Sequence, residues 1–144
     1  MPKHRVQVRV FYADTDAMGI VYHTNYIRWF EIGRTELLRD MGISHDRMAG
    51  EPFLLPLTRV YCHYFVSARI DQLLTMETEI AYLKRASIKF HYEIWDENRD
   101  VKMVEGYSVH ACTDRSGRIV RMPDFCVRQV LHHEPQLKGE RNGR

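Results

Sequence analysis

Alternating hydrophobic and polar positions open this chain. In residues 4–13, Val6, Val8, Val10 and Tyr12 fall on one face and polar residues mostly on the other. A period of two in a valine-rich stretch predicts a strand with one buried face. Strand-like segments follow at residues 57–65, 74–84, 86–95 and 101–113. We therefore expect five strands, with Tyr12 pointing with the core residues at the end of the first.

Between the first two strands the pattern changes to that of a helix. A helix is predicted over about residues 24–41, with Thr24 or Asn25 as its N-cap and Gly42 ending it. Gly33, inside this helix, costs about 1 kcal/mol relative to alanine, so we expect a close approach to the sheet there. The apolar positions at near-helical spacing are Ile27, Phe30, Leu37, Leu38 and Met41.

The order of these elements predicts an α+β fold. Residues 43–56 are expected to form a loop, and Pro123 opens a short helix over 124–132. Short turns between strands favour antiparallel pairing, so we expect a five-stranded antiparallel sheet curved around the long helix. We expect one domain over residues 1–131 and a polar, frayed tail over 132–144. Apolar residues on both faces of the strands indicate a homo-oligomer; they are Tyr61, Phe65, Trp95 and Val104.

Composition narrows the class of protein. A formal net charge of +2 is too small to indicate a nucleic-acid partner. No apolar run approaches the ~20 residues that a membrane-spanning helix needs. Three cysteines without a CxxC pair, and no signal peptide, favour a reduced, cytoplasmic, soluble protein.

Candidate chemistry gathers in the turn before the long helix. Asp14, Asp16, Gly19 and His23 lie there, and the unpaired N–H groups of a helix N-terminus favour negative charge. Asp16 can serve as nucleophile or as general base for water, His23 can orient a group or carry a proton, and Tyr12 can donate a hydrogen bond. The structural alternative, an Asx-turn that only shapes the loop, stays open on these residues alone.

Other chemistries lack their motifs. There is no P-loop, no GxGxxG and no GxSxG, which disfavours nucleotide chemistry and an α/β-hydrolase. The Asp–His pair lacks the spacing of a metal site. We expect neither a metal nor another cofactor.

The string VFYADTDAMGIVYHTNY (10–26), followed by FEIGRTELLR (30–39), closely resembles the hotdog-fold acyl-CoA thioesterases. It is most similar to the 4-hydroxybenzoyl-CoA thioesterase class and, within it, to the Tol-Pal-associated acyl-CoA thioesterases. The order of elements is compatible over about residues 4–131. The resemblance implies an antiparallel sheet wrapped around the long helix, and subunits that form dimers and tetramers.

The resemblance also implies roles for single residues. Asp16 matches the catalytic carboxylate, and Tyr12 and His23 match positions that support it. The backbone N–H of His23 matches the group that polarises the thioester carbonyl, and Gly19 the glycine that lets the backbone approach the acyl group. Asp14 matches a residue that holds the loop.

The implied substrate is an acyl-CoA, hydrolysed to a free acid and coenzyme A. Its phosphates need cations, and Lys84 and Arg85 are the candidates, with ordinary solvated charges as the alternative. Two other functions stay open: a hotdog hydratase or dehydratase, and a non-catalytic module that binds acyl thioesters. The acyl group itself is left open, from short or long aliphatic to aromatic.

Overall fold

A computed structural model describes residues 3–44 and 53–140 of the chain. Most of the loop predicted over 43–56 lies outside these ranges. The elements, in chain order, are β1 (His4–Arg9), η1 (Tyr12–Asp14), α1 (Thr24–Asp40), β2 (Leu57–Tyr64), β3 (Leu73–Leu83), β4 (Ser87–Asp96), β5 (Lys102–Ala111), α3 (Asp124–His133) and η2 (Pro135–Glu140).

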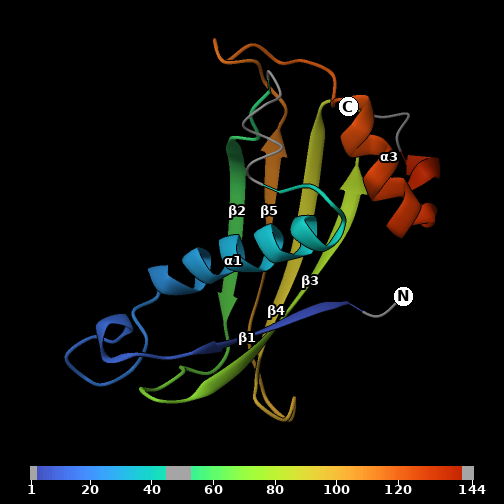
Figure 1. Ribbon diagram of the computed structural model, residues 1–144. Coiled ribbons are helices and arrows are strands. Elements are labelled where there is room, and N and C mark those ends of the chain that lie inside the picture. Colours follow the sequence, from blue (N-terminus) through green and yellow to red (C-terminus); the bar gives the residue numbers. More distant parts are fainter. Residues whose placement is uncertain (1–2, 45–52, 141–144) are drawn as a thin grey trace.

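The five strands form one sheet in the order β1-β3-β4-β5-β2, and every neighbouring pair is antiparallel. Helix α1 lies across one face of this sheet, as Figure 1 shows. The predicted α+β fold, a five-stranded antiparallel sheet with one long helix against it, is confirmed.

The helix lies close to the sheet because two small residues meet bulky neighbours. A Cβ at Gly33 would overlap the Thr78 hydroxyl, which confirms the packing role expected for this glycine. On β5, Gly106 leaves room for the ring of Phe30, which stacks on Tyr92 with ring centroids 4.2 Å apart. Burying these large rings supplies much of the apolar stabilisation between the two layers.

Two local predictions are wrong at the start of the helix. The N-cap is His23, not Thr24 or Asn25, and the Asn25 amide instead donates a 2.8 Å hydrogen bond to the carbonyl of Asp14. Tyr12 does not face the core. Strand β1 ends at Arg9, the chain turns into η1, and Tyr12 is 82% exposed.

Two other predictions change further along the chain. The segment expected to be a frayed tail continues as α3 to His133 and as η2 to Glu140, and Leu137 is buried because it packs against the core. Val104, which the sequence offers as a sign of oligomerisation, lies in the core, whereas Tyr61 and Phe65 are exposed.

The helix expected over 124–132 is confirmed as α3. None of the helices in the described ranges is both long and apolar enough to span a bilayer.

Candidate active site

Asp14 ties the loop before α1 together. This buried carboxylate accepts hydrogen bonds from the Phe11 N–H (2.8 Å) and from Arg28 Nη2 (2.7 Å). Its backbone carbonyl accepts from the Tyr22 N–H (2.9 Å) and from the Asn25 amide (2.8 Å). Both carboxylate oxygens are therefore engaged, which fits the loop-holding role expected for Asp14.

Asp16 has a different environment. It is exposed, and its Oδ1 accepts a 2.8 Å hydrogen bond from the Met18 N–H, the contact of an Asx-turn. Its carbonyl accepts from the N–H of Gly19, which has a φ of +78° that favours glycine. Within the described residues, its Oδ2 has no hydrogen-bond partner. The predicted Asx-turn thus exists, but it leaves one carboxylate oxygen available to a ligand.

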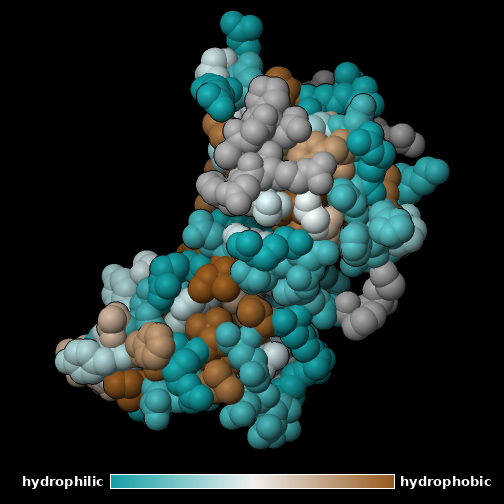
Figure 2. Space-filling view, viewed as in Figure 1, coloured by the Kyte–Doolittle hydropathy of each residue, from teal (hydrophilic) through white to brown (hydrophobic). Residues whose placement is uncertain are grey.

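Asp16 and His23 line one pocket. Its wall is completed by the first turn of α1, through Tyr26, and by the end of β2 and the following loop, through Tyr64 and Ser67. The loop that carries Asp16 projects beyond the sheet at the start of α1 (Figure 1), and Figure 2 shows apolar surface exposed there. The structure therefore brings together the two side chains that the sequence placed at the centre of the site.

The start of α1 supplies hydrogen-bond donors to this pocket. Within the described part of the chain, the N–H groups of His23 and Thr24 have no acceptor. Tyr64 donates a 3.1 Å hydrogen bond to the His23 carbonyl, and burial raises the pKa of Tyr64, with Cys62 adding to the effect, so its hydroxyl stays a donor. Free N–H groups at a helix N-terminus suit an oxygen that gains negative charge.

Four expected site residues are not among those that line this pocket. Gly19 precedes Ile20, which does line it. Tyr12 is on the exposed side of the loop, where its carbonyl accepts hydrogen bonds from Thr15. Lys84 and Arg85 follow β3 at the end remote from Asp16; the strand's 11 residues span about 35 Å. Lys84 Nζ lies 4.4 Å from the ring centroid of Tyr82. Their roles in catalysis and CoA binding stay predictions.

Tyr64 was not expected in the site, whereas the resemblance already implied that the segment containing Ser67 shapes the loop near it. Both residues follow Asp16 by about fifty positions in the sequence. Backbone pairing brings that turn beside the loop: Ile20 pairs with Arg69, and the Val21 N–H donates a hydrogen bond to the Ala68 carbonyl.

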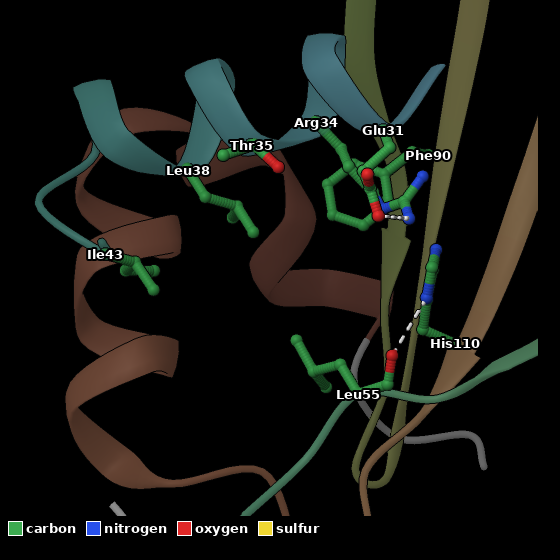
Figure 3. Close-up of a pocket in the computed structure, with 8 residues that line it drawn as sticks. All are labelled: Glu31, Arg34, Thr35, Leu38, Ile43, Leu55, Phe90 and His110. Atoms are coloured by element: carbon green, nitrogen blue, oxygen red, sulfur yellow. Dashed lines mark hydrogen bonds and ion pairs between the residues drawn. The ribbon is translucent and has the colours of Figure 1, made fainter. Parts of the chain in front are cut away.

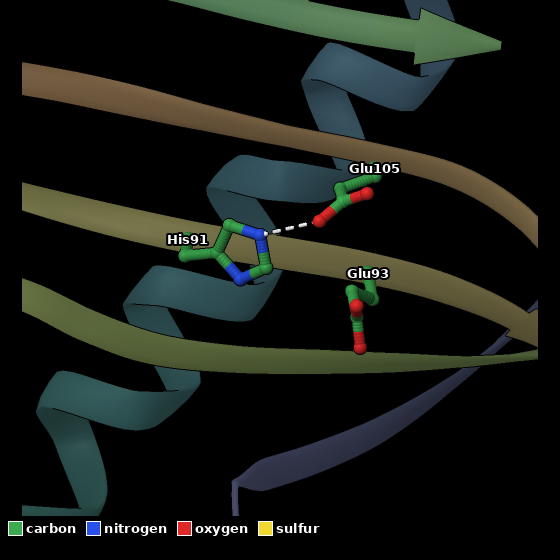
Figure 4. A group of neighbouring side chains, drawn as sticks. All are labelled: His91, Glu93 and Glu105. Atoms are coloured by element: carbon green, nitrogen blue, oxygen red, sulfur yellow. Dashed lines mark hydrogen bonds and ion pairs between the residues drawn. The ribbon is translucent and has the colours of Figure 1, made fainter.

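A second cluster of polar residues lies on the sheet face opposite α1. His91, Glu93 and Glu105 have ligand atoms within 4.8 Å of one another (Figure 4). Lys102 donates a 3.0 Å hydrogen bond to Glu105, and this bond together with that from His91 lowers the pKa of Glu105. Lys3 likewise pairs with Glu93 at 3.1 Å. With two lysines engaging its carboxylates, the cluster is an ion-pair network, remote from Asp16.

Comparisons with known proteins agree with this geometry. Residues 10–130 match the sequence profile of the Thioesterase-like superfamily. The chain is 38% identical over 129 residues to the acyl-CoA thioesterase YbgC of Haemophilus influenzae, covering 88% of this chain and 92% of that protein. It is 37% identical over 90 residues to the acyl-CoA thioester hydrolase YbgC of Escherichia coli, covering 62% and 67%.

A solved structure shares the fold. The crystal structure of a "Probable Thioesterase" from Bartonella henselae superposes with a TM-score of 0.78 at 33% identity, covering 84% of this chain and 99% of that one. The fold defines a hotdog-fold protein of the thioester hydrolase class. This chain belongs to the Thioesterase-like superfamily, and the family predicted from its sequence is confirmed.

Proposed function

We propose that this protein hydrolyses acyl-CoA thioesters to a free acid and coenzyme A, with Asp16 as the reacting carboxylate. One observation carries the proposal: Asp16 and His23 line the same pocket, and within the described residues the Asp16 Oδ2 and the His23 N–H have no hydrogen-bond partner. Hydrolysis of an acyl thioester needs both a group that attacks the carbonyl carbon or activates water and a donor for the carbonyl oxygen.

The geometry supports two routes. The thioester oxygen accepts a hydrogen bond from the His23 N–H, and negative charge grows there as the carbonyl carbon is attacked. In the covalent route Asp16 attacks, the C–S bond breaks, the thiolate takes up a proton, and water hydrolyses the mixed anhydride. In the general-base route Asp16 takes a proton from water as the water attacks the carbonyl carbon, the C–S bond breaks, and the proton passes to the leaving thiolate.

Single turnover in oxygen-18 water tests the covalent route. In that route, water attacking the Asp16 side of the anhydride leaves label in that carboxylate, measured by mass spectrometry of its peptide. Label found only in the released acid is expected both of the general-base route and of water attacking the acyl side of the anhydride, so label in Asp16 is the outcome that identifies the covalent route. The activity itself is tested by thiol release from acyl-CoAs of different length and shape, and no release from any of them would contradict the proposed hydrolysis.

We also propose that two chains pair along β2. This strand is a sheet edge on which seven of its eight residues are exposed. Tyr61 and Tyr64 on it, with Phe65 and Val66 after it, offer apolar surface to a second copy. Unpaired strand edges of this kind readily pair with another chain. Light scattering tests this: Tyr61→Asp should shift the protein toward monomer, whereas Ile119→Asp, at an exposed site away from β2, should not.

In this assembly Lys84 and Arg85 would serve a neighbouring subunit. Their distance from Asp16 along β3 prevents them from holding the phosphates of a CoA bound in their own chain's pocket.

The three cysteines form no disulfide, which supports the cytoplasmic setting expected from the sequence.

A further inference from the structure

A groove follows α1 away from the candidate active site. Near the first turn of the helix it is lined by Thr24, Ile27 and Val60, and near the last turns by Leu38 and Phe90. Glu31 and Arg34 border both parts, so the two parts adjoin one another. The first part begins at Thr24, which follows His23 in the chain, and its exposed lining is mostly apolar, which suits an acyl chain.

Polar side chains interrupt this apolar lining. His110 Nδ1 lies 3.1 Å from the Leu55 carbonyl, His110 Nε2 lies 2.9 Å from Ser108 Oγ, and Ser108 Oγ lies 2.6 Å from the Tyr92 hydroxyl. All three side chains are buried. Burial, and secondarily the charge of Arg34, lowers the pKa of His110 to about 4, so its ring is neutral near pH 7.

The directions of these hydrogen bonds follow from the Leu55 carbonyl at one end. A carbonyl only accepts, so the neutral His110 ring donates from Nδ1 to Leu55 and accepts at Nε2. Ser108 must then donate to His110, and Tyr92 must donate to Ser108. The polar hydrogens of His110, Ser108 and Tyr92 are all used in these hydrogen bonds. The three side chains therefore keep acceptor lone pairs but offer no free donor to a ligand. Among the side chains near the last turns of α1 that line this groove, Arg34 is the cation, so it is the donor best suited to a negatively charged ligand group.

Arg34 donates a hydrogen bond to the Tyr92 hydroxyl, and its charged partner is weak. Its Nη2 lies 3.7 Å from Glu31 Oε1, and the Glu31 side chain is 66% exposed while that of Arg34 is 20% exposed. Arg28, six residues earlier on the helix, is instead joined to Asp14 at 2.7 Å. Figure 3 shows Arg34 and His110 directed toward the same space between helix and sheet. A half-enclosed guanidinium with a loose, solvated partner suits a carboxylate ligand.

We infer that the preferred acyl group ends in a carboxylate that Arg34 binds. This inference rests on the proposed thioester hydrolysis and names its substrate class: mono-CoA esters of straight-chain dicarboxylic acids. Thr24 and Arg34 are ten residues apart, about 15 Å along the helix axis. The Arg34 side chain leans back toward the helix N-terminus, which shortens this span. An extended aliphatic chain fits that length.

The test compares kcat/KM for dicarboxylic mono-CoA esters with that for monocarboxylic CoA esters of the same chain length. The wild type should prefer the carboxylate-ended ester, and Arg34→Met should reduce that preference about 10- to 100-fold, the effect of one charge-assisted hydrogen bond. Arg34→Lys should keep part of the preference. Arg39→Met is the matched control, since Arg39 also pairs with a glutamate three residues before it but lies outside the groove.

Binding gives a readout independent of turnover. Calorimetry on the Asp16→Asn protein should show tighter binding of the carboxylate-ended ester, and the added Arg34→Met should abolish the difference. If the wild type hydrolyses both ester series equally, or if Arg34→Met keeps the preference, the inference is wrong while the proposed hydrolysis stands. If the wild type hydrolyses neither series nor any other acyl-CoA, the proposed function falls and takes this inference with it.

Discussion

Arg28 donates a 2.7 Å hydrogen bond from Nη2 to Oδ1 of Asp14, and this ion pair joins the second turn of α1 to the loop that carries Asp16. The Asp14 carboxylate is nearly enclosed, whereas Arg28 is half exposed. The two aspartates of the DTD sequence thus have separate tasks. Asp14 fixes the loop, and Asp16 lines the pocket with one carboxylate oxygen that has no partner in the part of the chain that the structure describes.

Breaking this ion pair should loosen the loop. Asp14→Ala leaves the Phe11 N–H and Arg28 without their acceptor, so we expect a loss of about 1–3 kcal/mol in the free energy of unfolding, measured in urea. Catalysis should fall with it because Asp16 loses its position. Glu36→Ala removes an exposed partner of Arg39 and should change stability by less than about 1 kcal/mol. Equal losses in the two variants would contradict the role given to Asp14.

Gly33 should not tolerate a side chain. In Gly33→Ala the new Cβ overlaps the Thr78 hydroxyl on β3, so helix and sheet must separate. Overpacking of this kind costs about 1–3 kcal/mol, which outweighs the gain of up to about 1 kcal/mol in helix propensity. Thermal unfolding should show a lower Tm, and a Tm equal to or above that of the wild type would refute the close approach.

His110 should make stability depend on pH. Its folded-state pKa of about 4 lies below the ordinary 6.5, so the unfolded chain takes up the proton first as pH falls. The free energy of unfolding should therefore drop by about 3 kcal/mol from this group between pH 6.5 and 4, with no further change from it below that range. The difference between wild type and His110→Gln, followed by urea unfolding across this range, isolates the effect. Parallel pH profiles for the two proteins would show that His110 is not held neutral.

Much of the fold could be predicted because the period of the hydrophobic positions in the sequence reflects which side of each helix or strand is buried. The α1 bounds, Thr24–Asp40, agree with the helical pattern, and the strands agree to within a residue or two at most ends. Tyr12 shows where alternation misleads. The alternating pattern of the first strand continues through Tyr12 in the sequence. In the structure Tyr12 lies in a turn instead, because the Phe11 N–H donates a hydrogen bond to the Asp14 side chain.

The candidate site could be predicted only where it is contiguous in sequence. Asp16, Gly19 and His23 occupy one loop, and both the turn chemistry and the resemblance pointed to them. Tyr64 reaches the pocket through strand pairing, and Arg34 and His110 meet only because α1 crosses β5. No periodicity in the sequence encodes such crossings. The positive charges of Lys84 and Arg85 suit the phosphates of CoA, but charge says nothing of the distance of these residues from Asp16.

The central claim is that Asp16 performs the chemical step, and thiol release by Asp16→Asn tests it most directly. The variant keeps the size of the side chain and an oxygen that can accept from Met18, so the loop and the Tm should be retained. It lacks the carboxylate that attacks or takes a proton, so kcat with a good acyl-CoA should fall about 10²- to 10⁴-fold. Turnover near the wild-type value in a folded Asp16→Asn protein would contradict the account.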